Sequence, residues 1–167
     1  MVAAKNWMTG NEYTICTLGN IIVLIWTAFP SVDGVQACAA AFSTLRREEP
    51  TARIGLLSIV ESEAGHGAMD PAVRNALGKM LKENESVLRA AAIVFEAQGF
   101  RATVIRSVVT AINMASRLGY PTAVFSDRLS GAKWLVMEQM AGHSSVTMAS
   151  LSSLLRSTRS ANSALTP

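Results

Sequence analysis

The stretch "GNIIVLIWTAFPSVDG", residues 19–34, is the most apolar part of this chain and decides its fold. Its apolar run from Ile21 to Phe29 is far shorter than the roughly 20 residues that a helix needs to cross a bilayer. Most side chains in the run are β-branched or aromatic, and such residues suit a strand that is covered on both faces. We therefore expect a buried strand rather than a membrane anchor, with Pro30 ending it.

A β-hairpin is expected where this strand meets the residues before it. Gly19-Asn20 is a two-residue turn signal, and residues 13–18 alternate side chains of types that favour strands. The first two strands of the domain are therefore expected to be antiparallel neighbours.

After Pro30 the sequence alternates between helical and strand patterns. Helices are expected over residues 31–49, 69–84, 101–119 and 130–142, and strands over residues 52–62, 88–98 and 122–127. Strand–helix–strand units of this length require right-handed crossovers and a mainly parallel sheet. The predicted fold class is α/β: an N-terminal β-hairpin followed by βα units, with a mixed, mainly parallel five-stranded sheet covered by about four helices. In the last helix, Trp134, Leu135 and Met137 are expected to face the core.

The chain divides into three parts by composition. Residues 1–10 are expected to be a flexible N-terminus, residues 11–141 a single α/β domain, and residues 142–167 a Ser/Thr-rich tail. If residues 145–157 are helical, the tail carries an apolar face made of Val146, Leu151, Leu154 and Leu155. We expect this face to dock on a second copy in a two-fold dimer. Docking on the chain's own core, or contact with a membrane surface, are the alternatives.

Charge and cysteine usage narrow the classes of partner. The formal net charge is +3, and the Lys and Arg residues are scattered among acids rather than clustered, so no nucleic-acid partner is expected. The two cysteines, Cys16 and Cys38, lie in segments expected to be buried and have no metal-ligand spacing. Reduced thiols of this kind suit a cytoplasmic protein. The first residues contain no apolar segment typical of a signal peptide.

Polar side chains gather after the third and fourth predicted strands. The carboxyl ends of parallel strands meet at one edge of a sheet, so these side chains are expected to share a crevice there. The interaction or ligand candidates are Glu61, Ser62, Glu63, His66 and Asp70 after the third strand, and Glu96 and Arg101 after the fourth.

Acids and a histidine are also the residue types of a metal or acid–base site. The histidine is single, however, and no two acids have the i, i+4 spacing of a helical ligand pair. We therefore favour a solvated loop in which Asp70 caps a helix and Arg101 pairs with Glu96. No catalytic residue, metal or cofactor is expected.

The predicted order of elements, together with "YPTAVFSDRLSGAKWLVMEQ" (residues 120–139), resembles the STAS-type fold of anti-sigma-factor antagonists. The similarity is to the divergent sporulation-stage-II-AA-like, or STAS/SEC14-like, branch, and it rests on Phe125, Ala132, Trp134 and Leu135 in the last strand and helix. The resemblance implies a bacterial signalling module that contacts a protein partner, such as a regulatory kinase or a sigma-factor-type regulator. In that family a partner kinase phosphorylates a serine in an Asp-Ser-Ser-Gly turn.

The corresponding connection in this chain departs from that pattern. It reads "ESEAGHGAMD" (residues 61–70), in which Ser62 is the only hydroxyl. A phosphorylation switch is therefore not visible in its usual form. Three functions remain, in this order: a regulatory interaction module acting through residues 61–70 and the following helix; a carrier or sensor of a lipid or other small apolar ligand; and an enzyme that uses His66.

Overall fold

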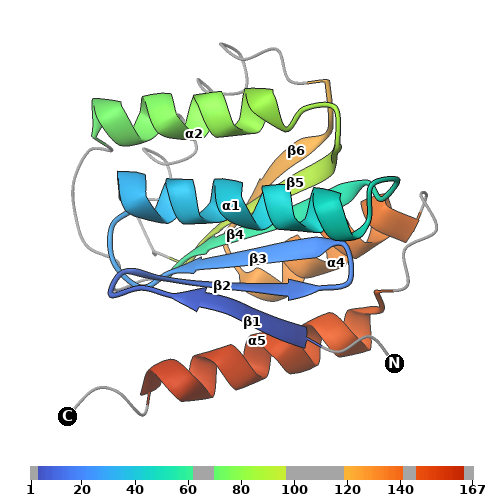
Figure 1. Cartoon of the computed structure of the whole chain (residues 1–167). Helices are drawn as coiled ribbons and strands as arrows, with labels where there is room; N and C mark the ends of the chain where they lie inside the picture. The colour runs from blue at the N-terminus through green and yellow to red at the C-terminus, as the bar shows by residue number, and fades with distance from the viewer. Residues whose placement is uncertain (1–3, 62–69, 97–118, 141–145, 164–167) are drawn as a thin grey trace.

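The structure is a computed structural model that describes residues 4–61, 70–96, 119–140 and 146–163 (Figure 1). Six strands form one sheet, and their order across the sheet is their order along the chain. The strands are β1 (Ala4–Thr9), β2 (Tyr13–Leu18), β3 (Ile21–Trp26), β4 (Ile54–Val60), β5 (Leu88–Phe95) and β6 (Thr122–Phe125). The first three strands are antiparallel and the others run parallel to β3. This confirms an α/β fold with an N-terminal hairpin and a mainly parallel sheet.

The apolar stretch at residues 19–34 contains a central strand of the sheet. All six residues of β3 are buried, and the strand lies between β2 and β4. The turn before it contains Gly19 with a φ of 54°, a conformation that glycine adopts without steric penalty. The apolar run is thus a strand in the middle of the sheet, as expected, but the strand ends at Trp26, before Pro30 is reached.

The sheet has six strands rather than the expected five. Residues Ala4–Thr9 pair antiparallel with β2, from Ala4 opposite Leu18 to Thr9 opposite Thr14, with an irregularity between Asn6 and Met8. These residues mix polar and apolar types without the run that marks a central strand, which is why the sequence pattern placed them outside the sheet. An edge strand such as β1 is paired on one side only and needs less apolar surface.

Helices cover both faces of the sheet (Figure 1). One face is covered by α1 (Val32–Glu48) and α2 (Pro71–Glu83), and the other by α4 (Arg128–Met140) and α5 (Met148–Ser163). Because successive side chains of a strand point to opposite faces, β3 sends Leu24 and Trp26 toward α1 and α2, and Val23 and Ile25 toward α4 and α5. The molecule therefore has two hydrophobic clusters, one on each side of the sheet.

The helix starts show why these helices begin where they do. Ser31 caps α1 by accepting a hydrogen bond from the Gly34 backbone N–H at 3.3 Å, and Asp70 caps α2 by accepting one from the Ala72 N–H at 2.7 Å. In addition, Pro71 opens α2, where its missing N–H costs nothing.

The tail packs on the chain's own core. Val146, Leu151, Leu154 and Leu155 are all buried in the cluster that α4 and α5 form with the sheet. The expectation that this apolar face docks on a second copy is therefore wrong, and its alternative, docking on the chain's own core, is what the structure shows. The helix begins at a reciprocal pair: Ser150 N–H donates to Thr147 Oγ1 at 3.2 Å, and Thr147 N–H donates to Ser150 Oγ at 3.1 Å.

One core assignment on α4 is also wrong. Met137 is 63% exposed, whereas Leu135 is buried and Trp134 is half-buried against the Phe125 ring at a centroid distance of 5.7 Å. The buried face of α4 is made of Ala132, Leu135, Val136 and Gln139, which is the i, i+3, i+4, i+7 spacing of one helix face, and Met137 lies off that face. The helix expected over residues 101–119 lies outside the described residues, apart from Gly119.

Two further expectations concern the cysteines and the membrane. Cys16 and Cys38 are free and buried, as expected, and burial raises the pKa of each thiol to about 12. Both thiols therefore stay protonated and unreactive in the folded chain. Among the described residues, no helix combines the length and the apolar character needed to cross a membrane.

Candidate functional site

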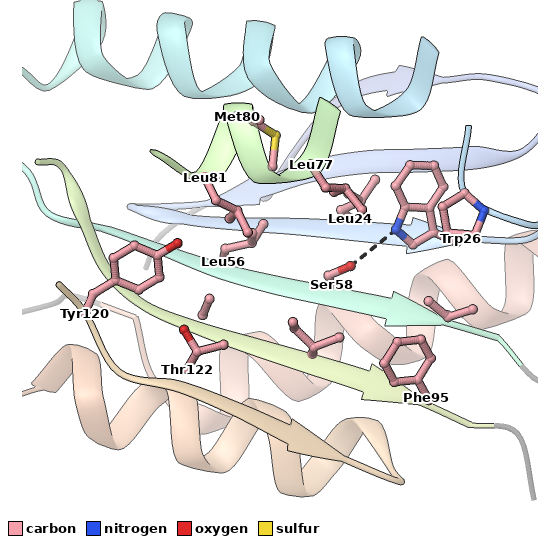
Figure 2. Close-up of a pocket in the computed structure, with 14 residues that line it drawn as sticks. Leu24, Trp26, Leu56, Ser58, Leu77, Met80, Leu81, Phe95, Tyr120 and Thr122 are labelled. Carbon is pink, nitrogen blue, oxygen red and sulfur yellow. Dashed lines mark hydrogen bonds between the residues drawn. The ribbon is translucent and has the colours of Figure 1, made fainter. Parts of the chain in front are cut away.

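A pocket lies between the sheet and α2 (Figure 2). Its volume is about 70 Å³, and it is partly open to the surface. The lining comes from β3, the residue Pro30 before α1, β4, α2, β5, and the start of β6 with the segment before it: Leu24, Trp26, Pro30, Leu56, Ser58, Val60, Leu77, Met80, Leu81, Ala91, Ile93, Phe95, Tyr120 and Thr122. Nearly all of these side chains are apolar, so the pocket is a gap in the core of one face.

Small side chains on two neighbouring strands leave this space. On the face that α2 covers, β4 presents Ser58 between Leu56 and Val60, and β5 presents Ala91 next to Ile93. Leu77, Met80 and Leu81 of α2 line the same pocket on the side away from the strands (Figure 2). The pocket therefore follows from two small residues placed in otherwise bulky strands.

The hydroxyl groups of Ser58, Tyr120 and Thr122 meet the pocket, and that of Ser58 already has a partner. The indole Nε1–H of Trp26 donates to Ser58 Oγ at 3.2 Å. This bond satisfies the buried indole and holds its ring against one end of the pocket (Figure 2).

The hydroxyls of Tyr120 and Thr122 lie at the other end of the pocket (Figure 2). Both oxygens are buried, and within the described part of the chain neither has a hydrogen-bond partner. A buried hydroxyl without a partner weakens a fold by about 1–3 kcal/mol. Two such groups in one pocket are therefore a feature that the packing of the described residues does not satisfy.

The backbone on both sides of Tyr120 is held in place. The Gly119 N–H donates to Glu85 Oε1 at 2.7 Å, and the carbonyl of Pro121 accepts from the Ala91 N–H at 3.0 Å. Tyr120 itself is only 6% exposed. Burial raises the pKa of its phenol, and the negative charge of Glu85 raises it further, so the hydroxyl stays protonated and can donate.

A second polar cluster lies on the opposite face, where β4 and β5 end. Arg128, in the first turn of α4, donates through Nε to Glu96 Oε1 at 2.7 Å and through Nη2 to Glu96 Oε2. The same Nη2 donates to Glu61 Oε1 at 3.2 Å. Asp127 caps the helix by accepting from the Ser130 N–H at 2.8 Å, which fixes the turn that carries the arginine.

The charges of this cluster are paired rather than free. Arg128 is 6% exposed, and its hydrogen bonds with Glu96 are the main reason that the pKa of its guanidinium is raised. A doubly bonded arginine–carboxylate pair fixes geometry as well as charge. The cluster therefore ties the carboxyl ends of two strands to α4 and serves the architecture.

The predicted site residues divide into three groups. The structure brings Glu61 and Glu96 together at the edge of the sheet, and it places Asp70 at the start of α2 as a cap. Ser62, Glu63, His66 and Arg101 lie outside the described residues, so the predicted Glu96–Arg101 pair remains a prediction. Among the residues that the structure describes, no group of three or more His, Cys, Asp or Glu side chains is placed to hold a metal ion.

Sequence reasoning missed Arg128, Ser58, Tyr120 and Thr122. The signal for Ser58 is visible, because it is the one polar residue inside the apolar strand "IGLLSIV" (residues 54–60). Tyr120 and Thr122 carry no such signal, since their role depends on which strands lie beside them. Comparisons of the chain with family models, with curated proteins and with solved structures found no match. The site is therefore interpreted from its geometry.

Proposed function

We propose that this chain is a non-enzymatic binding module, and that the pocket under α2 takes a small, mostly apolar ligand. The observation that supports this is a space of about 70 Å³ in the core together with two buried hydroxyls that lack partners. Protein interiors contain few voids larger than a water molecule. A space of this size is therefore unusual for a protein core, which supports a ligand that fills it.

The energetic cost of the unfilled pocket supports the same proposal. At about 24 cal/mol per Å³ of cavity, a volume of 70 Å³ corresponds to about 1.7 kcal/mol of lost stability. The unpartnered hydroxyls of Tyr120 and Thr122 add to this penalty. A ligand that fills the space and forms hydrogen bonds with the hydroxyls removes both the cost of the cavity and the cost of the unpartnered hydroxyls. Its binding therefore stabilises the folded chain.

The lining favours binding over catalysis. Among the residues that line the pocket there is no His, Asp, Glu, Lys or Arg, and the phenol of Tyr120 stays protonated. General acid–base and nucleophilic mechanisms need a group that takes up a proton near the reacting atom. This pocket offers hydroxyl donors and apolar surface, which are the means of holding a ligand.

The size of the pocket limits the ligand. Its 70 Å³ is several times the roughly 10–15 Å³ that one water needs and about half of the roughly 150 Å³ of an engineered cavity that binds benzene. The enclosed space is therefore too small for a whole ring such as benzene, and because the pocket is partly open, the occupant is a small ring or chain that projects into the opening, or one end of a larger molecule. This favours a sensor of small compounds over a carrier that encloses a whole lipid.

The test is a pair of substitutions that differ only in where the added bulk goes. Ala91→Leu places three extra carbons in the pocket, and Ala40→Leu adds the same carbons at an exposed position on α1. In a titration with cyclopentane followed by NMR, the parent and Ala40→Leu chains are expected to show saturable shifts of the Leu56 and Ile93 methyl groups. Ala91→Leu is expected to show none. Equal responses in all three chains would refute the pocket as the binding site.

A regulatory protein-interaction module of STAS type is the second proposal. The observed order of hairpin, strands and helices supports it, as does the first turn of α2, where Pro71, Ala72 and Arg74 are exposed. In this proposal a cytoplasmic partner, such as a regulatory kinase or a sigma-factor-type regulator, contacts residues 61–70 and α2. A homodimer belongs to the same proposal.

The second proposal is tested with a photo-crosslinking amino acid at position 74 in cells. A defined partner captured there, and not from a matched exposed site at position 133 on α4, supports the interaction module. Equal capture from both positions, or none from either, counts against it.

A further inference from the structure

We propose that Tyr120 and Thr122 form a polar recognition end of the pocket, and that its ligand is a neutral ketone or alcohol with a small apolar body. This inference rests on the proposed binding function and specifies the class of ligand. Three observations support it: the positions of the two hydroxyls, their ability to donate hydrogen bonds, and the lack of charged side chains among the described residues that line the pocket.

The placement follows from strand geometry. Thr122 begins β6 directly beside Ala91 of β5, and Tyr120 precedes it by two residues, so both side chains project to the same face of the sheet. Figure 2 shows both hydroxyl oxygens turned toward the space beneath Leu81. Neither hydroxyl bonds to the other or to any described residue, although both oxygens are buried. A single ligand oxygen between them is the arrangement that satisfies both.

The chemistry of the two hydroxyls selects an acceptor. The Tyr120 hydroxyl keeps its proton and donates, and the Thr122 hydroxyl can donate or accept. A carbonyl oxygen has two lone pairs and can accept from both hydroxyls. An alcohol oxygen can accept a hydrogen bond from the Tyr120 hydroxyl, and the alcohol hydroxyl can donate to or accept from that of Thr122. Ser58 is a weaker candidate for this role because its oxygen already accepts from Trp26.

The surroundings disfavour a charged ligand. Among the residues that the structure describes, no cationic side chain lines the pocket, and the charge that acts on Tyr120 is the carboxylate of Glu85. Moving a carboxylate or phosphate into this space would remove its hydration without providing an opposite charge. The remaining walls, including Leu24, Leu56 and Phe95, suit the hydrocarbon part of a neutral molecule.

The experiment compares probes of matched size on the full chain by NMR titration. Cyclopentanone and cyclopentane share a ring and differ in one oxygen. The parent chain is expected to bind cyclopentanone at least tenfold more tightly than cyclopentane. Acetone and acetate match in heavy atoms and differ in charge, and acetone is expected to shift the pocket methyl groups while acetate does not.

Two variants test whether the preference for cyclopentanone over cyclopentane depends on the hydroxyls of Tyr120 and Thr122. Tyr120→Phe is expected to reduce the ratio of cyclopentanone to cyclopentane affinity to about two or less, while cyclopentane affinity stays within about twofold of the parent value. Thr122→Val is expected to lower the same ratio at least threefold. Because both variants replace an unpartnered buried hydroxyl by a group of similar shape, the fold is expected to persist.

The outcomes separate this inference from the function on which it rests. Equal affinity of the parent chain for cyclopentanone and cyclopentane overturns the polar recognition end and leaves the apolar binding site standing. A preference for cyclopentanone that survives both variants also overturns it. Binding of neither compound, or shifts that Ala91→Leu does not abolish, overturns the binding function and this inference together.

Discussion

Replacing Tyr120 by phenylalanine is expected to stabilise the free chain, which is the reverse of the usual effect. A tyrosine hydroxyl that is bonded in a core contributes about 1 kcal/mol, and its removal ordinarily destabilises a protein. Here the hydroxyl is buried and has no partner among the described residues, while the ring remains packed in either variant. Removing the oxygen therefore removes a desolvation penalty.

The expected magnitude follows from that penalty. An unsatisfied buried hydroxyl costs about 1–3 kcal/mol, and the small void left by the missing oxygen offsets part of the gain, so we expect about 1–2 kcal/mol. For a chain of this size, each kcal/mol corresponds to roughly 2–4 °C in melting temperature. The gain is expected to shrink when cyclopentanone is present, because the parent hydroxyl then has a bond to lose.

Urea unfolding followed by circular dichroism measures this change. The midpoint of Tyr120→Phe is expected to rise while the slope with urea stays that of the parent. Tyr13→Phe is the control, since the Tyr13 hydroxyl is directed to Met8 Sδ at 3.6 Å near the surface and its removal is expected to change little. If Tyr120→Phe instead destabilises the free chain by 1 kcal/mol or more, its hydroxyl has a partner in solution and the reasoning about the pocket is refuted.

Three other predictions test the architecture. Arg128→Met leaves the two carboxylates that Arg128 binds without a cation. The fold is expected to lose stability toward the lower end of about 3–5 kcal/mol, because those carboxylates are partly exposed. Urea unfolding measures the loss, with Arg74→Met on the exposed side of α2 as the control, and equal midpoints of the two variants would contradict it. Deletion of residues 143–167 is expected to lower the melting temperature without changing the oligomeric state seen by sedimentation, since the tail covers the chain's own core; a tail that serves a dimer would give the opposite pair of results. Cys16 and Cys38 are expected to resist iodoacetamide at pH 8 in the folded chain and to react in urea, because burial raises the pKa of both thiols to about 12; labelling of the folded chain, read by mass spectrometry, would show that the core opens.

The elements could be predicted because their signals are local. The run from Ile21 to Trp26 marks a buried strand by its own composition, and Ser31 and Asp70 mark helix starts by the bonds that they make within one turn. Alternation of such elements then limits the topology to a mainly parallel sheet. The same local signals fail for β1, which gains its order from pairing with β2 at an edge.

The candidate site could not be predicted in the same way because it is made by neighbours distant in sequence. Arg128 joins Glu61 and Glu96 only once α4 lies across the ends of β4 and β5, and a charged residue in a polar stretch gives no sign that it will be buried. The pocket likewise needs Ala91 and Ser58 to lie diagonally across neighbouring strands under α2, with Ala91 beside Leu56 and Ser58 beside Ile93. The sequence shows two small residues, and only the register of the strands shows that they leave one space.

The most direct test of the pocket under α2 as a binding site is a crystal structure of the full chain under xenon pressure. Xenon enters apolar cavities and needs no hydrogen-bonding group. A xenon atom is expected in contact with Leu56, Met80 and Ala91, and none is expected at this position in an Ala91→Leu crystal treated in the same way. A crystal that takes up xenon elsewhere but none at this position, or in which the side chains of α2 close the space over Ala91, would contradict it.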